Sequence, residues 1–178
     1  MTSNSITGIA VLSSDQFCFL KANILINQGG HACLADFGLL TIVSDPKYST
    51  TSVSLTTPGT TRWMSPELLN PHWFNHQYGQ PTKESDCYAL GMVTLEVLSG
   101  QAPFAQYKDL DIVWKVIKGE HPGRPKGVEG AWFTDDLWGM LELCWATQPT
   151  SRPSAEAMLE CFIQVSRVWK LVDEIDEE

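Results

Sequence analysis

The carboxylate of Asp36 is the side chain whose setting in this sequence points most directly to chemistry. It follows a short apolar run, precedes Phe37 and Gly38, and stands 31 residues before Glu67. Three such residues occur together by chance in many sequences, so the weight lies on the motifs around them. A carboxylate that leaves a strand can bind a divalent cation beside an amide oxygen such as that of Asn23, although two oxygens alone hold Mg²⁺ weakly.

Two short apolar runs are expected to hold these two side chains near each other. Residues 24–27 and 31–35 flank a turn at 28–30 that contains two glycines. Because glycine takes positive φ at a tight turn, this pattern predicts a β-hairpin. Asn23 and Asp36 would then be presented from opposite ends of one small ribbon, close enough to share a cation.

The remainder of the chain is predicted to be helical around one central helix. Residues 86–100 are apolar nearly all round, and Ser85 and Gly100 are suited to cap and to end this buried helix. Apolar residues at helical spacing predict further helices at 110–118, 135–144 and 154–172. The predicted fold class is therefore mainly α with a small β-hairpin.

Five motifs in a fixed order resemble those of the protein kinases. They lie at residues 21–26, 36–38, 59–67, 86–91 and 144–153. In that order they resemble the end of the catalytic loop, the D-F-G motif, the substrate-facing loop with A-P-E, helix F and the entry to helix I. The resemblance runs from about Lys21 to Val165, and R-W-M-S-P-E is most similar to the tyrosine-kinase-like group of serine/threonine kinases. It covers only the large, C-terminal lobe.

The resemblance implies a cofactor and two residues that would hold it. In the protein kinases, the residues that match Asn23 and Asp36 bind the magnesium ions that bridge the phosphates of ATP. Mg-ATP is therefore the implied cofactor, although binding by this chain is doubtful without the rest of a nucleotide cleft. The implied substrate is a protein that accepts phosphate on serine or threonine.

The resemblance also implies structural roles. Phe37, Gly38 and Thr60 would belong to the activation segment, in which Thr60 matches the threonine that bonds the catalytic aspartate and lysine. The aspartate that opens helix F, here Asp86, would tie down the backbone of the catalytic loop. Glu67 and Arg152 match a buried ion pair between the end of the activation segment and the last helices, and breaking one member of such a pair costs several kcal/mol.

The sequence departs from the family where catalysis depends on it most. Counting back five residues from Asn23, the position of the catalytic-loop aspartate holds Cys18, and in the other possible alignment it holds Phe19. Neither side chain can replace the carboxylate. Residues 1–20 contain no G-x-G-x-x-G motif and are too short for a small lobe with its nucleotide lysine. We therefore expect no catalytic residue here, since Asp15 lies outside the family's loop pattern.

Composition excludes several other classes of protein. The chain has 178 residues, of which 43% are apolar, and its net charge is -9. An acidic chain is not expected to bind nucleic acid or an anionic membrane surface, and no apolar run reaches the ~18 to 20 residues that span a bilayer. The five cysteines are widely spaced and form no C-x-x-C pair, so we expect free, mostly buried thiols and a cytoplasmic location.

Two functional classes remain open, and both assume the same division of the chain into segments. We expect a divergent or poorly ordered segment at 1–20, a kinase-like C-lobe at 21–170 and an acidic tail at 171–178. The first class is a serine/threonine kinase domain that is truncated and inactive as an isolated chain. The second is a pseudokinase-like scaffold that binds a protein partner, for instance in the groove beside residues 110–118.

Overall fold

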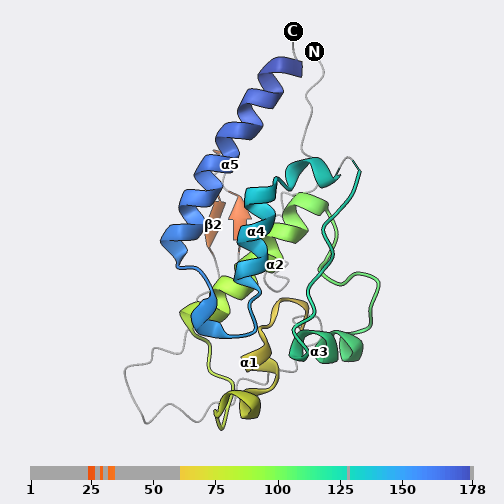
Figure 1. Ribbon diagram of the computed structural model, residues 1–178, viewed down its shortest axis with the longest axis vertical. Helices are drawn as coiled ribbons and strands as arrows, with labels where there is room; N and C mark the ends of the chain where they lie inside the picture. Colours follow the sequence, from red (N-terminus) through yellow and green to blue (C-terminus); the bar gives the residue numbers. More distant parts are fainter. Residues whose placement is uncertain (1–23, 27–28, 30–31, 35–60, 128, 177–178) are drawn as a thin grey trace. The chain divides into compact units, whose positions relative to one another are not determined.

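The computed structural model describes residues 24–26, 29, 32–34, 61–127 and 129–176 of the chain (Figure 1). The chain divides into two compact units, Met1–Ser54 and Leu55–Glu178. The described part of the first unit is a β-hairpin, and that of the second unit is helical. The predicted fold class, mainly α with a small hairpin, is confirmed.

The hairpin consists of two three-residue strands, β1 (Ile24–Ile26) and β2 (Ala32–Leu34). They are antiparallel, with Ile24 opposite Leu34 and Ile26 opposite Ala32, and Gly29 lies in a turn between them. The short apolar strands and the glycine turn therefore fold as the sequence predicts.

The register of the hairpin fixes which ends of the two strands lie together. Since Ile24 pairs with Leu34, the chain enters β1 and leaves β2 at the same end of the ribbon. Asn23 and Asp36 lie outside the described residues, so where they are presented stays a prediction. In any antiparallel pair, the start of one strand lies beside the end of its partner.

The second unit is built from five α-helices and four short 3₁₀ helices in its described part. The α-helices are α1 (Pro66–Leu69), α2 (Lys83–Ser99), α3 (Asp109–Ile117), α4 (Asp135–Cys144) and α5 (Ala155–Asp176), and the 3₁₀ helices are η3 (Thr61–Trp63), η4 (Pro71–Phe74), η5 (Glu129–Trp132) and η6 (Pro149–Ser151). Helix α4 has the predicted bounds and α3 differs by one residue at each end. Helix α5 continues four residues past the predicted end at 172, into the acidic stretch.

Helix α2 begins earlier than predicted, because its N-cap is Thr82 rather than Ser85. The amide of Ser85 donates to the Thr82 hydroxyl at 3.2 Å, and the amide of Thr82 donates to the Ser85 hydroxyl at 2.8 Å. This reciprocal capping box satisfies two amides that a helix start leaves unpaired. Gly100 ends the helix as predicted, with a left-handed φ of 69°.

Helix α2 is the centre of the core of this unit, and it packs against α4, which in turn packs against α5 (Figure 1). The core side chains are large and apolar, and they include Tyr88, Met92, Leu95, Ile112, Phe133, Leu137, Leu141, Trp145 and Met158. The helix is not buried all round, however, since the side chain of Val97 is 65% exposed and that of Leu90 is 39% exposed. None of the described helices is long and apolar enough to cross a membrane.

Helix α2 and the end of α4 approach each other closely at Gly91. A Cβ atom at this glycine would lie 2.9 Å from the Cβ of Cys144 and 2.8 Å from Nε1 of Trp145. Such distances are too short for any side chain, so glycine is required there by the packing of the two helices.

Candidate functional site

The residues singled out from the sequence fall into two groups. Asn23, Asp36, Phe37, Gly38 and Thr60 lie outside the described residues. Glu67, Asp86 and Arg152 lie in the helical unit, where the structure gives their surroundings. The site that can be built from contacts is therefore the one that fixes residues 61–69 onto the helices.

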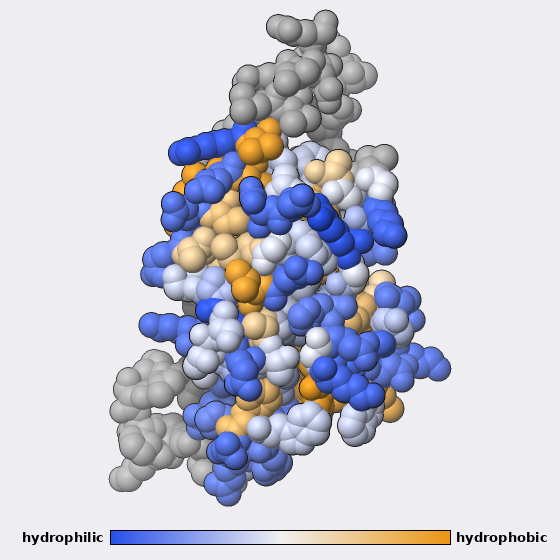
Figure 2. Space-filling view, in the orientation of Figure 1, coloured by the Kyte–Doolittle hydropathy of each residue, from blue (hydrophilic) through white to orange (hydrophobic). Residues whose placement is uncertain are grey.

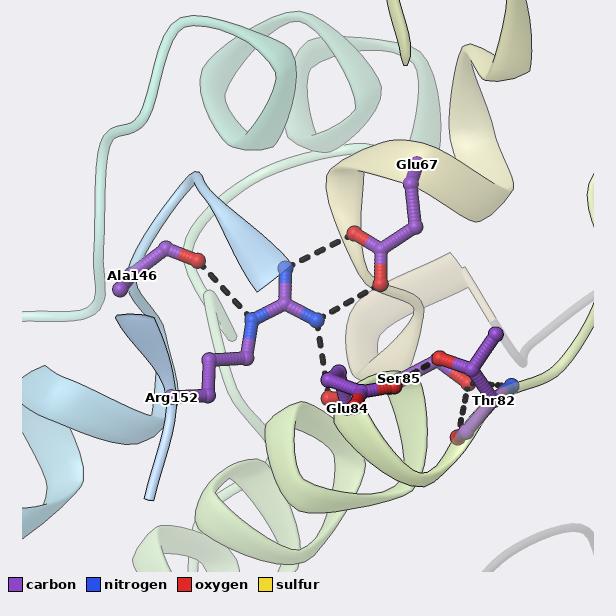
Figure 3. A network of polar contacts seen from close by, with 6 residues as sticks. All are labelled: Glu67, Thr82, Glu84, Ser85, Ala146 and Arg152. Atoms are coloured by element: carbon purple, nitrogen blue, oxygen red, sulfur yellow. Dashed lines mark hydrogen bonds and ion pairs between the residues drawn. The ribbon is translucent and has the colours of Figure 1, made fainter. Parts of the chain in front are cut away.

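Glu67 and Arg152 are joined by a bidentate ion pair (Figure 3). The Nη1 of Arg152 lies 2.6 Å from Oε1 of Glu67, and Nη2 lies 2.8 Å from Oε2. The arginine side chain is 0% exposed and the glutamate side chain 7% exposed. Two parallel charge-assisted hydrogen bonds in such a buried setting fix the direction of α1, in which Glu67 occupies the first turn.

Arg152 also binds two further segments of the chain. Its Nη1 donates to the carbonyl of Glu84 at 2.8 Å, and its Nε donates to the carbonyl of Ala146 at 2.9 Å. The guanidinium lies 5.1 Å from the centre of the Tyr88 ring, and burial raises the pKa of that phenol. One side chain thus connects α1, the first turn of α2 and the segment that follows α4, and its charge is compensated on several sides.

Trp63 forms a second anchor. Its indole Nε1 donates to Oε2 of Glu96 at 3.1 Å, and the two residues are 7% and 4% exposed. Because Glu96 lies near the end of α2, this bond holds η3 against the central helix. No local sequence pattern predicts this bond, since the partners are 33 residues apart and Glu96 stands in an apolar run.

Arg62 forms a third anchor, on the loop between α2 and α3. Its Nη1 donates to the carbonyls of Pro103 and Phe104 at 3.0 and 2.8 Å, and its Nη2 donates to the carbonyl of Tyr107 at 3.0 Å. Nη2 also lies 3.3 Å from Oδ1 of Asp109. The loop needs this support, because Phe104 has a left-handed φ of 55° although it is not glycine.

Asp86 lies on α2 with an exposed side chain. Partial burial of the carboxyl raises its pKa. Among the described residues, none donates a hydrogen bond to this carboxylate. The catalytic-loop backbone that the resemblance assigns to it lies outside the described residues, so its role as an anchor stays a prediction.

The surface of α3 carries exposed apolar side chains beside a shallow groove. Leu110 and Trp114, one turn apart, are 78% and 62% exposed. The groove has a volume of about 370 Å³ and is lined by Tyr107, Asp111, Trp114, Lys115, Lys118 and Glu120. Elsewhere, hydrophobic patches on the face seen in Figure 2 are small and lie among hydrophilic residues.

Lys115 and Glu120 form an ion pair at the rim of this groove. Their Nζ and Oε2 atoms are 2.6 Å apart, and the Lys115 ammonium lies 4.4 Å from the centre of the Tyr107 ring. The hydrogen bond between them raises the pKa of Lys115 and lowers that of Glu120. Both groups face solvent, so the contribution to stability is small.

No group of three or more histidine, cysteine or acidic side chains suited to a metal ion occurs in the described part of the chain. A metal site built on Asn23 and Asp36 would lie outside it. Oxygen donors of these two types suit Mg²⁺.

Comparison with known proteins gives a consistent result. A family model described as protein tyrosine and serine/threonine kinase matches residues 8–162. A probable serine/threonine-protein kinase of Dictyostelium discoideum is 29% identical over 138 residues, which cover 77% of this chain and 13% of that protein. Mitogen-activated protein kinase kinase kinase 1b of Physcomitrium patens is 30% identical over 138 residues, which cover 78% of this chain and 16% of that protein.

A mammalian relative is similar over a longer stretch. The cytoplasmic tyrosine-protein kinase BMX of Mus musculus is 28% identical over 159 residues, which cover 87% of this chain and 22% of that protein. The chain therefore spans less than a quarter of the length of these three relatives.

Proposed function

We propose, from the premise that this chain belongs to the protein tyrosine and serine/threonine kinase family, that it provides the large-lobe platform of a kinase domain and does not itself transfer phosphate. Proteins of this family use ATP with a divalent metal and act on protein substrates. The observation that carries the platform role is the triple anchoring of residues 61–69 by Arg62, Trp63 and Glu67.

The anchoring supports this role because it fixes the segment on which a substrate would lie. Each anchor binds a different part of the unit: the loop after α2, the end of α2, and the segment that follows α4. The activity of such a domain depends on positioning more than on covalent chemistry by the protein. We infer that a protein serine or threonine is the group this platform would present.

The absence of phosphotransfer is inferred from one position. Cys18, or Phe19 in the other alignment, stands where the family has its catalytic aspartate. Without that carboxylate, the group that accepts the proton of the substrate hydroxyl in this family has no counterpart at its usual position. Asn23 and Asp36 are the residues that would hold the magnesium of Mg-ATP, which supplies the phosphoryl group when bound. Two oxygens alone hold Mg²⁺ weakly, so we expect little binding by this chain.

A phosphorylation assay on the purified full chain tests this proposal. We expect no transfer from Mg-ATP to a general protein substrate, and no rise in melting temperature when Mg-ATP is added. Transfer that disappears in Asp36→Asn and persists in the matched control Asp45→Asn would contradict the inference. The same pair of variants decides whether any nucleotide-dependent thermal shift comes from the predicted metal ligands.

A binding module is the second candidate function. It is favoured by the exposure of Leu110 and Trp114 beside the groove on α3. Selection of a displayed peptide library on the full chain should enrich binders that Trp114→Ala loses. Trp73→Ala is the matched control, since Trp73 is 65% exposed on a different element. Equal loss in both variants, or none in either, would argue against this groove.

The cellular location of the protein and its division into segments are also proposals. We propose a cytoplasmic protein whose partners are proteins rather than nucleic acids or membranes, with segments at 1–20, 21–170 and 171–178. Fractionation of cells that express the tagged chain checks the first point. Limited proteolysis with mass mapping of the fragments checks the second, because cleavage is expected to concentrate near the segment boundaries.

A further inference from the structure

One face of α3 carries large apolar side chains that do not belong to the core of the helical unit. The opposite face of the helix is buried through Ile112 and Val116, and these contacts hold α3 in place. Leu110 and Trp114 are instead strongly exposed, on a helix that lies at the edge of the unit (Figure 1). Large apolar side chains that are exposed together, rather than singly, indicate an interaction surface.

The charged side chains beside Trp114 have a definite order along the helix. Asp111 stands in the first turn of α3, and Lys118 is its C-cap. Both side chains are exposed, and both line the groove together with Trp114. Because seven residues make almost two helical turns, these three side chains form one stripe, with Asp111 and Lys118 about 10 Å apart along the axis.

Neither charge of this stripe has an ion-pair partner within the described part of the chain. Asp109 and Lys115, the other charged residues of α3, already form ion pairs with residues outside the stripe. Lys118 is near enough to Glu120 to lower the pKa of that carboxyl, but the hydrogen bond to Glu120 comes from Lys115. Asp111 and Lys118 are therefore the two charges of this helix that can bind a partner.

The stripe is complementary to itself. Residues 111 and 118 are equally far from the midpoint between residues 114 and 115. A two-fold axis at that midpoint would place Asp111 of each copy opposite Lys118 of the other, with the two Trp114 rings near the centre. Helices that pack about 8–10 Å apart bring such side chains within reach of each other. A two-fold contact of this kind uses the same surface patch in both molecules.

We propose that α3 is a self-association surface, on which a second copy of the chain packs antiparallel and forms reciprocal Asp111–Lys118 ion pairs around Trp114. This inference rests on the second candidate function above, a binding site in the groove on α3, and it identifies the partner as a second copy. An interface centred on one short helix is small, so the dimer is weak and reversible. The ion pairs set its register and its specificity more than its affinity.

Sedimentation velocity of the purified full chain over a concentration series tests the proposal, and a monomer–dimer equilibrium is expected. Asp111→Lys sets lysine against lysine at both ends of the contact, and Lys118→Asp sets aspartate against aspartate. Each variant alone should dimerise at least about tenfold more weakly than wild type. The two variants change the net charge in opposite directions, so a general charge effect would not weaken both. Glu160→Lys, at an exposed position of α5, is the matched control and should dimerise like wild type.

A mixture of the two variants decides whether the contact is the proposed one. In a mixed dimer the introduced lysine faces the introduced aspartate, and the unchanged Asp111 of one copy faces the unchanged Lys118 of the other. Dimerisation should therefore return to nearly the wild-type affinity. Because this recovery requires both variants to be folded, it excludes a folding defect as the cause of the loss.

Three results would overturn the proposal: a wild-type chain that stays monomeric at every concentration, dimerisation that neither variant weakens, or a mixture that does not recover. If the chain is monomeric while selected peptides still bind in a Trp114-dependent way, the groove is a site for a different protein. In that case self-association fails and the second candidate function stands.

Discussion

Two ion pairs in the helical unit have the same shortest nitrogen–oxygen distance, 2.6 Å, in opposite settings. Arg152 and Glu67 are 0% and 7% exposed, while Lys115 and Glu120 are 25% and 48% exposed. The buried pair connects segments 85 residues apart, and the surface pair joins residues five apart at the end of α3. Distance alone therefore says little about what an ion pair contributes.

The two ion pairs differ in what solvates the remaining charge when one partner is removed. At the surface, water solvates the remaining charge, and the pair is worth little. In the interior, water cannot solvate the remaining charge, so the free energy of unfolding falls strongly when one partner is removed. The intact pair is nevertheless not strongly stabilising relative to apolar residues. A buried pair therefore acts through specificity, because only one arrangement of α1 satisfies Arg152.

The largest effect is expected from breaking the buried pair. Arg152→Ala leaves the Glu67 carboxylate buried, and should lower the free energy of unfolding by about 3–5 kcal/mol. Urea denaturation of the full chain measures it. Arg167→Ala, which removes an exposed arginine from α5, is the matched control and should leave the midpoint unchanged. A loss of less than about 1 kcal/mol in Arg152→Ala would contradict the distinction between the two pairs.

An intermediate effect is expected at Arg62, whose side chain is 19% exposed. Arg62→Lys keeps the charge but cannot reach three carbonyls at once, so a loss of about 1–3 kcal/mol is expected. The same variant should increase protease cleavage in the loop between α2 and α3. If Arg62→Lys equals wild type in both measurements, the contacts to the loop carbonyls do not stabilise it.

A smaller effect is expected from pH, through His121, which follows Glu120 of the surface pair. Its ring lies 5.9 Å from that of Trp145, and burial lowers its pKa below the ordinary 6.5. As pH falls below 6.5, the unfolded chain binds this proton first, so stability present above 6.5 is lost on acidification. His121→Gln should reduce the fall in melting temperature between neutral pH and about pH 5. An unchanged pH profile would exclude His121 as its cause.

The smallest effect is expected at the surface pair itself. Lys115→Ala should leave the urea midpoint within measurement error, because water and salt replace the lost partner. Glu120→Ala should behave in the same way, and high salt should abolish any difference that remains. A clear destabilisation in both single variants would show that exposure does not separate the two pairs.

Local patterns in the sequence predicted the elements well, because the apolar spacing that defines a helix or hairpin lies within the element itself. Helix α4 and the hairpin are examples. The start of α2 was missed since Thr82 and Ser85 form a polar capping box ahead of the apolar pattern. The apolar residue Val97 was predicted to be buried within the central helix, but its side chain is 65% exposed.

Contacts between distant residues were harder to predict. Glu67 and Arg152 were paired through the resemblance to kinases, whereas no local pattern links positions 85 apart. The anchors at Arg62 and Trp63 were missed, because the acceptors are mostly backbone carbonyls 41 to 45 residues away and one buried glutamate. The predicted metal ligands and Thr60 lie outside the described residues, so their placement stays a prediction.

Phe104 illustrates how the backbone and the core can place opposed physical requirements on one position. Its left-handed backbone, with φ of 55°, would suit glycine, yet its side chain is only 4% exposed and fills space in the core. A glycine would relieve the backbone and leave a void, while a β-branched residue would fill only part of the void and worsen the backbone. Few amino acids can satisfy both demands, so this position is expected to tolerate few substitutions.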